Sequence, residues 1–131
     1  MNLFVYGTLR RGMSNAGYLR DAKLIAAKAW TEGKLYDTRR GYPGLVPGQG
    51  TVYGEIYRIH RMQIKQVDDL EDYYGPGHPQ NMYERKLKRV ATDHGFVWAY
   101  LYYYCDQEKL MKTGIWIPGG DWCSYAGKKK G

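Results

Sequence analysis

Residues 3–10 read Leu-Phe-Val-Tyr-Gly-Thr-Leu-Arg and place a short apolar strand directly before a glycine and a hydroxyl side chain. This order is typical of a strand that ends in a turn, and Thr8 can cap the segment that follows. Gly7 permits backbone angles that point successive N–H groups into one concavity, where carboxylate or other anionic oxygens bind. Taken alone, such a stretch more often forms a tight turn without a ligand.

The rest of the chain alternates short β-branched or aromatic segments with turns. Gly54, inside one of these segments, marks a bulge or a close approach of two backbones. Short strands with one firm helix predict a single α+β domain over residues 1–131, a small β-barrel whose tail from about residue 117 is loosely packed. The predicted strands are residues 24–34, 51–59, 83–90 and 96–104, with a hairpin turn at 93–95 and a turn-rich loop at 39–50.

Composition excludes several classes of protein. No run approaches the roughly 18 apolar residues that span a bilayer, and the N-terminus lacks the basic and apolar regions of a secretory signal. Cys105 and Cys123 are too few for a disulfide scaffold, and we expect two separately buried thiols. No cluster of His, Cys or carboxylate residues has metal-ligand spacing. The sequence therefore predicts a cytoplasmic protein that uses no membrane, no metal and no cofactor.

The chain is also basic and rich in tyrosine. It has 20 Lys and Arg against 13 Asp and Glu, for a net charge of +7, and 14 of its residues are Tyr. Cations that neutralise phosphates and rings that stack on bases are typical of nucleic-acid binding. However, the cations are spread along the chain, and the alternating Tyr100, Tyr102 and Tyr104 more often form a barrel wall. The sequence thus disfavours nucleic acid as the partner.

The segment 61–74 is the one convincing helix, and it carries an acidic residue on its buried side. Glu71 projects within the apolar face, and a carboxylate held against apolar side chains has a raised pKa, as a general acid or base needs near neutral pH. On helix geometry alone, an edge position from which Glu71 reaches water or a nearby Arg remains the more common case. The apolar face consists of Ile64, Val67, Leu70 and Tyr74, and the solvated face carries Asp68, Asp69 and Asp72.

Five motifs occur in order along the chain. They are Phe-Val-Tyr-Gly-Thr-Leu-Arg at 4–10, Gly-Tyr-Pro-Gly-Leu at 41–45, Val-Tyr-Gly-Glu-Ile-Tyr at 52–57, Val-Asp-Asp-Leu-Glu-Asp-Tyr at 67–73 and Tyr-Glu-Arg at 83–85. With these motifs the chain resembles the γ-glutamylcyclotransferase-like superfamily, in particular its γ-glutamylamine cyclotransferase and YtfP-like branch. The resemblance covers residues 3 to about 104 and implies a mixed barrel of about six or seven strands with flanking helices.

The resemblance also implies which residues form the site. Glu71 is the expected catalytic acid and base, and Tyr83 lines the same cavity with Arg85 as a neighbour. The insert at 75–81 is expected to border the cavity, and the loop at 10–18 to influence the choice of leaving group. The γ-glutamyl moiety is expected to be held by Tyr6, Gly7, Thr8 and Leu9.

The reaction that the resemblance implies is an intramolecular attack of the α-amine of a small γ-glutamyl amide on its γ-carbonyl. The products are 5-oxoproline and a free amine or amino acid, and no cofactor is required. The sequence leaves open which γ-glutamyl compound is the substrate and which oligomeric state the protein adopts. A non-catalytic barrel that binds a small metabolite or a polyanion such as RNA is the alternative.

Overall fold

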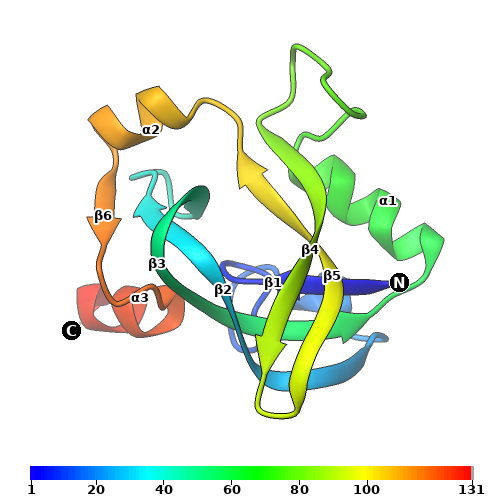
Figure 1. Cartoon of the computed structure of the whole chain (residues 1–131). Coiled ribbons are helices and arrows are strands. Elements are labelled where there is room, and N and C mark those ends of the chain that lie inside the picture. Colours follow the sequence, from blue (N-terminus) through cyan, green and yellow to red (C-terminus); the bar gives the residue numbers. More distant parts are fainter. Residues whose placement is uncertain (131) are drawn as a thin grey trace.

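The computed structural model describes residues 1–130; Gly131, the end of the predicted single domain and its tail, lies outside the described residues. The described chain forms six strands, three α-helices and a short 3-10 helix (Figure 1). In chain order these are β1 (Asn2–Val5), η1 (Ala16–Leu19), β2 (Lys23–Asp37), β3 (Pro43–Arg58), α1 (Arg61–Leu70), β4 (Tyr83–Thr92), β5 (Gly95–Tyr104), α2 (Gln107–Thr113), β6 (Ile115–Ile117) and α3 (Trp122–Lys130).

Five of these strands close into a barrel. The sheet order is β3-β1-β5-β4-β2, β2 pairs with β3 to close the ring, and β6 adds one strand on β2. β1 runs parallel to β5, and the other pairs are antiparallel. The helices lie outside the barrel, with α1 beside β1 and β5 (Figure 1). The predicted α+β class and mixed barrel with flanking helices are confirmed, and the four predicted strands correspond to β2, β3, β4 and β5.

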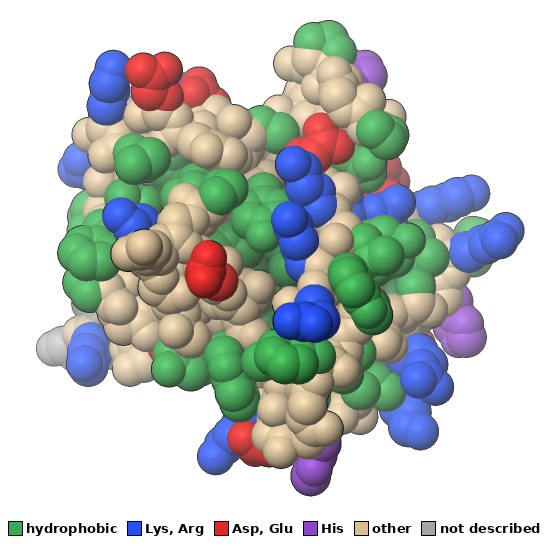
Figure 2. Space-filling view, viewed as in Figure 1, with side chains coloured by type: hydrophobic (Ala, Val, Ile, Leu, Met, Phe, Trp, Pro, Cys, Tyr) green, Lys and Arg blue, Asp and Glu red, His purple; other side chains and the backbone are tan. Residues whose placement is uncertain are grey.

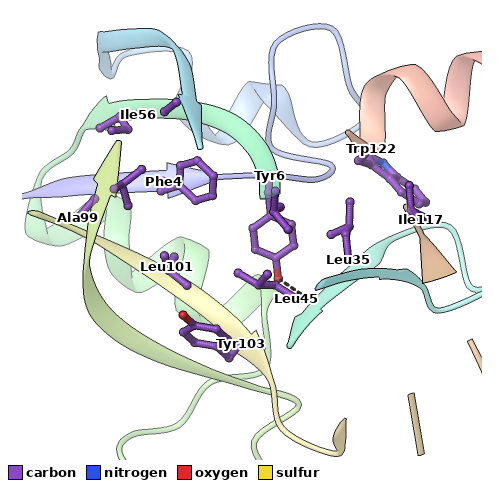
Figure 3. Close-up of a cluster of buried hydrophobic side chains, with 13 residues drawn as sticks. Phe4, Tyr6, Leu35, Leu45, Ile56, Ala99, Leu101, Tyr103, Ile117 and Trp122 are labelled. Atoms are coloured by element: carbon purple, nitrogen blue, oxygen red, sulfur yellow. Dashed lines mark hydrogen bonds between the residues drawn. The ribbon is translucent and has the colours of Figure 1, made fainter. Parts of the chain in front are cut away.

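β1 has a continuous apolar sequence because both of its faces are buried. Phe4 and Tyr6 point into the barrel and belong to its central cluster (Figure 3). Leu3 and Val5 point outward and pack in a second cluster with Val67 of α1. A strand that is covered on both faces carries apolar residues at every position. This arrangement directs the end of β1, and the turn that follows it, toward the space between the barrel and α1.

The prediction of a turn-rich loop at 39–50 is wrong for most of its length. β3 begins at Pro43 and remains in the sheet because it pairs with β2 along this segment. The turn is confined to residues 38–42, where Gly41 has a φ of 92°. Pairing with a neighbouring strand therefore outweighs the local preference of Gly and Pro for turns.

α1 is shorter than the predicted helix at 61–74. It ends at Leu70, and Asp72 adopts a left-handed backbone conformation with a φ of 51°. The chain therefore leaves the helical path, which buries Tyr73 and leaves Tyr74 exposed. The expectation that Tyr74 belongs to the buried face is wrong for this reason.

Beyond β5 the chain forms two helices and a strand that the sequence does not predict. Trp122 of α3 is buried in the central cluster and lies near Leu35 and Ile117 (Figure 3). Both cysteines are free, but Cys105 follows the end of β5 and is exposed, so its expected burial is wrong. Among residues 1–130, no helix is both long and apolar enough to span a membrane.

Lys and Arg side chains form a row along β4 on the face that Figure 2 shows. The exposed cations of this strand are Lys86, Lys88 and Arg89. The Lys86 and Lys88 amino groups lie over the ring of Tyr103, at 6.0 and 5.9 Å from its centroid, and this ring is only 9% exposed. Because stacking on a base needs an accessible ring face, Tyr103 serves as barrel wall.

Candidate active site

The structure places the expected catalytic residue and the expected substrate-binding residues around one pocket at the end of β1: Glu71, Tyr6, Gly7, Thr8, Leu9 and Tyr83. The inner pocket is narrow, about 30 Å³, and opens into a vestibule of about 240 Å³ that shares Thr8, Tyr42, Glu71 and Tyr83 with it. Glu71 thus lies where the inner pocket meets the vestibule. The inner pocket is lined by Phe4, Val5, Tyr6, Gly7, Thr8, Leu9, Tyr42, Pro43, Glu71, Tyr83 and Tyr102.

The end of α1 positions the Glu71 carboxyl group. Glu71 is the C-terminal capping residue, and its N–H donates to the Val67 carbonyl at 2.9 Å. None of the described residues donates a hydrogen bond to its carboxylate. Burial and, to a smaller extent, the nearby negative charges of Asp72 and Asp68 together raise the pKa of Glu71 from 4.5 to about 7. At neutral pH this group can therefore both accept and release a proton.

Asp68, one turn before Glu71, fastens α1 to the barrel. Its carboxylate accepts hydrogen bonds from the Tyr102 hydroxyl at 2.5 Å and from Arg85 Nη1 at 3.0 and 3.1 Å. The expectation that Asp68 lies on a solvated face is therefore wrong. Arg85 is occupied by this ion pair and does not line the pocket, contrary to its expected place beside Tyr83.

The turn after β1 lines the pocket with residues whose backbone N–H groups are unpaired. Within the described residues, the N–H groups of Gly7, Thr8 and Leu9 donate no hydrogen bond, whereas Arg10 N–H closes the turn onto the Gly7 carbonyl at 3.1 Å. The loop is held further by Asn15, whose N–H donates to the Thr8 carbonyl at 2.8 Å and whose side chain donates to the Thr8 hydroxyl at 2.9 Å. Three unpaired N–H groups beside a cavity form a site for anionic oxygens.

Gly7 is required at this turn by close packing. A Cβ atom at this position would lie 2.7 Å from Cγ and 2.9 Å from Cδ of Pro43. Pro43 itself lines the pocket beside the turn. The absent side chain therefore allows the N–H groups to approach the β3 edge of the cavity.

The two tyrosines of the expected site shape the pocket through backbone contacts. The Tyr6 hydroxyl accepts from the Leu45 N–H at 3.3 Å (Figure 3) and donates to the Tyr102 carbonyl at 2.7 Å. The Tyr83 hydroxyl donates to the Pro43 carbonyl at 2.6 Å. Burial raises the pKa of both hydroxyl groups well above the ordinary value, so both rings stay neutral.

A carboxylate that the sequence analysis did not single out holds the loop from the other side. Glu55 is 5% exposed and accepts from Arg10 Nε, the Arg11 N–H and the Tyr57 hydroxyl, each at 2.9 Å. Arg10 Nη1 also reaches Asp121 at 2.9 Å. Glu55 could have been found from the sequence as the single acid in the strand segment at 52–57, whose other residues are apolar or aromatic.

The insert at 75–81 lies apart from the cavity. None of its residues lines the inner pocket or the vestibule, and the expectation that it borders the cavity is wrong. Its polar groups bind one another and the strand beside it: Asn81 accepts from the Tyr74 N–H at 2.7 Å, and Glu84 accepts from the Gly77 N–H at 3.1 Å. In contrast, the loop at 10–18 supplies Ser14 and Asn15 to the vestibule.

Among the described residues, no group of three or more His, Cys, Asp or Glu side chains could hold a metal ion. The pocket itself offers the carboxyl group of Glu71, the buried rings of Tyr6 and Tyr83, and the unpaired backbone N–H groups of residues 7–9. This combination suits proton transfer next to a carbonyl group whose oxygen gains negative charge.

Comparison with known proteins gives a match over almost the whole chain. A family model described as "Gamma-glutamyl cyclotransferase, AIG2-like" matches residues 3–124. A protein from Niallia circulans, named gamma-L-glutamyl-butirosin B gamma-glutamyl cyclotransferase, is 43% identical over 126 residues, which are 95% of this chain and 76% of the relative. The gamma-glutamylcyclotransferase family protein YtfP from Escherichia coli (strain K12) is 36% identical over 118 residues, 89% of this chain and 96% of YtfP.

The fold also matches solved structures. The crystal structure of YkqA from Bacillus subtilis superposes with a TM-score of 0.77 at 28% sequence identity. The match covers 98% of this chain but 42% of YkqA, so the present chain corresponds to less than half of that protein.

Proposed function

The chain belongs to the gamma-glutamyl cyclotransferase, AIG2-like family, and from this premise we propose that Glu71 moves the protons in the cyclisation of a γ-glutamyl amide to 5-oxoproline. One observation carries the proposal. A carboxyl group with a pKa of about 7 and the unpaired N–H groups of residues 7–9 line the same pocket. The first can exchange protons at neutral pH, and the second can bind an oxyanion.

The reaction begins with a proton transfer. The α-amine of the substrate is an ammonium ion near neutral pH and cannot attack until it loses a proton, which the Glu71 carboxylate accepts. The free amine then attacks the γ-carbonyl carbon and closes a five-membered ring. The carbonyl oxygen becomes an oxyanion, and we assign its stabilisation to the N–H groups of Gly7, Thr8 and Leu9.

Collapse of the tetrahedral intermediate completes the reaction. The bond from the γ-carbon to the amide nitrogen breaks, and the electron pair leaves with that nitrogen. Two protons in total pass from the α-nitrogen to the leaving nitrogen, and Glu71 carries each in turn. The products are 5-oxoproline and the protonated amine. Because ring closure needs a folded substrate, Tyr6 and Tyr83, which narrow the inner pocket, are assigned to hold that conformation.

The substrate class is proposed from the family and from the site together. The Niallia circulans relative is named for γ-L-glutamyl-butirosin B, a γ-glutamyl derivative. We propose that the present chain likewise acts on a γ-glutamyl amide and releases a free amine or amino acid. The surplus of seven positive charges attracts substrates that carry a carboxylate.

The test is to incubate the protein with γ-L-glutamyl-methylamide, γ-L-glutamyl-alanine and Nε-(γ-L-glutamyl)-lysine and to measure 5-oxoproline. Release from at least one of them is expected, with a loss of about 10²-fold or more in Glu71→Gln. Asp69→Asn is the matched control, because Asp69 is an exposed acid on the same helix. Equal activity of Glu71→Gln and the native chain contradicts the proposed role. Binding of these compounds without 5-oxoproline supports the metabolite-binding alternative instead.

A further inference from the structure

A large groove lies beside the candidate active site and has no part in the reaction described above. Its volume is about 860 Å³, and it runs between the loop at 12–14, the turn at 39–41 and α3. The inner pocket, at about 30 Å³, holds little beyond the reacting groups. A substrate larger than the γ-glutamyl group must therefore extend outward from Glu71.

The groove is continuous with the vestibule of the site. Thr8, Ser14 and Gly41 line both, and the vestibule in turn shares Glu71 with the inner pocket. Thr8 lines all three spaces, so the turn after β1 is the wall along which they connect. A single molecule that enters through the vestibule can thus contact Glu71 at one end and the groove at the other.

The far end of the groove is apolar and aromatic. Trp122 and Tyr125 of α3 lie with their ring centroids 5.6 Å apart, and Met13 and Ala126 complete this part of the lining. The Trp122 indole N–H is buried and has no hydrogen-bond acceptor among the described residues. Because this nitrogen exposes almost no surface, Trp122 contributes apolar ring surface to the groove and not a hydrogen-bond donor.

We infer that this groove is the subsite for the amine portion of the substrate, so that the protein prefers γ-glutamyl amides of large amines that have an apolar ring. The inference rests on the proposed function, because it assigns the part of the molecule that leaves when 5-oxoproline forms. The narrow inner pocket holds the γ-glutamyl group, the vestibule holds the scissile amide beside Glu71, and the groove holds the body of the amine.

Two substrates that differ only in the amine test this inference. The short one is γ-L-glutamyl-methylamide, which ends in the vestibule. The long one is N-(γ-L-glutamyl)-dansylcadaverine, whose naphthalene ring supplies the apolar body. We expect the native protein to give a kcat/KM for 5-oxoproline release that is at least roughly tenfold higher with the long substrate.

Variants of the groove separate this preference from the chemistry. Ala126→Trp fills the groove from α3, and Ser14→Trp, at an exposed loop position, blocks its connection to the vestibule. Both are expected to lower the ratio of long to short kcat/KM at least roughly tenfold, and Ser14→Trp keeps the test available if Ala126→Trp does not fold. Ser124→Trp is the matched control, since Ser124 is exposed on the same helix outside the groove, and it should keep the native ratio.

The outcomes distinguish the two proposals. A preference for the long substrate that Ser14→Trp abolishes and Ser124→Trp preserves supports the subsite. Equal kcat/KM for the two substrates in the native protein overturns the subsite and leaves the proposed cyclisation intact. Absence of 5-oxoproline from both substrates overturns the proposed function and the subsite with it.

Discussion

Asp68 in the last turn of α1 and Glu71, the residue that caps this helix, lie three residues apart but in different electrostatic environments. Asp68 is paired with Arg85 and bound by the Tyr102 hydroxyl, whereas Glu71 faces the pocket without a cation beside it. Burial raises the pKa of both carboxyl groups, but at Asp68 the Tyr102 hydroxyl and Arg85 counteract part of this rise. The first acid therefore anchors the helix, and the second is left free to titrate near neutral pH.

Glu71 should set the pH dependence of the activity. A general base works when it is deprotonated, so kcat/KM is expected to rise with pH, with a midpoint near the Glu71 pKa of about 7. Asp72→Asn removes a nearby negative charge that raises this pKa, and Asn tolerates the left-handed backbone at this position. The midpoint should therefore move to lower pH in Asp72→Asn and stay in place in Asp69→Asn. A rate profile with an unmoved midpoint in Asp72→Asn argues against Glu71 as the titrating group.

The same carboxyl group should make the folded state less stable as the pH rises. Because folding raises the Glu71 pKa from 4.5 to about 7, the folded state binds its proton more tightly than the unfolded state does. Its stabilising contribution is complete below about pH 4.5 and is lost as the pH passes through 7. Glu71→Gln does not titrate, so its free energy of unfolding relative to the native chain should increase by about 3 kcal/mol between pH 4 and pH 8. Urea unfolding at both pH values measures this, and a constant difference contradicts it.

Strands β1 to β5 could be predicted because they depend on local periodicity, whereas for Glu71 helix periodicity gave only a side of the helix, and an edge position remained the more common case. The sequence also predicted a bulge or a close approach of two backbones at Gly54. The structure shows the close approach, because a Cβ at this position would clash with the Val5 carbonyl oxygen. The extension of β3 back to Pro43 could not be predicted from the sequence, because it depends on pairing with β2. The burial of Trp122 depends in the same way on where α3 meets the barrel.

The candidate site was predictable for the residues that carry a motif and not for those that support them. The sequence places Gly7 and Glu71 in separate segments, and only the barrel shows that both line one pocket. The partners of Asp68 lie on β4 and β5, and the two arginines that bind Glu55 lie in the loop after β1. No local pattern reveals such contacts, because they join residues that are distant in the sequence. The catalytic and binding roles themselves stay predictions that the experiments above address.

Gly7→Ala should damage the site more than the fold. The added methyl group would press on Pro43, which must shift together with the pocket wall that it forms. We expect a loss of roughly tenfold or more in kcat/KM, with a cost of about 1–3 kcal/mol in stability. Gly12→Ala is a useful comparison: its turn is strained for alanine, with a φ of 82°, but nothing lies within 4 Å of the added carbon. If Gly7→Ala retains native activity, the close approach of the turn to Pro43 has no catalytic importance.

Tyr6→Phe should lower stability through the backbone groups that it leaves unpaired. The Tyr6 hydroxyl joins the Tyr102 carbonyl on β5 to the Leu45 N–H on β3. Removal of the oxygen leaves both backbone groups buried without this partner, at a cost of about 1–3 kcal/mol. Tyr18→Phe serves as the control in urea unfolding, because Tyr18 is exposed. Equal midpoints for the two variants would mean that the bridge contributes nothing measurable.

Arg10 should support both the fold and the position of the turn after β1. Its guanidinium joins Glu55 of β3 to Asp121 at the start of α3, and it is 13% exposed where it does so. Arg10→Ala leaves the Glu55 carboxylate buried without its cation, which should cost about 3 kcal/mol in urea unfolding. Arg10→Lys should recover only part of this, because one ammonium group does not reproduce the two-sided contact of a guanidinium. Arg20→Ala, at an exposed arginine, is the control and should unfold like the native chain.

Since Arg10 follows directly after residues 7–9, a loosened turn should also lower kcat/KM for every γ-glutamyl substrate by a similar factor. This effect differs from that of Ser14→Trp, which depends on the substrate. Native stability in Arg10→Ala would show instead that the bonds from Asn15 to Thr8 hold the turn without help from Glu55.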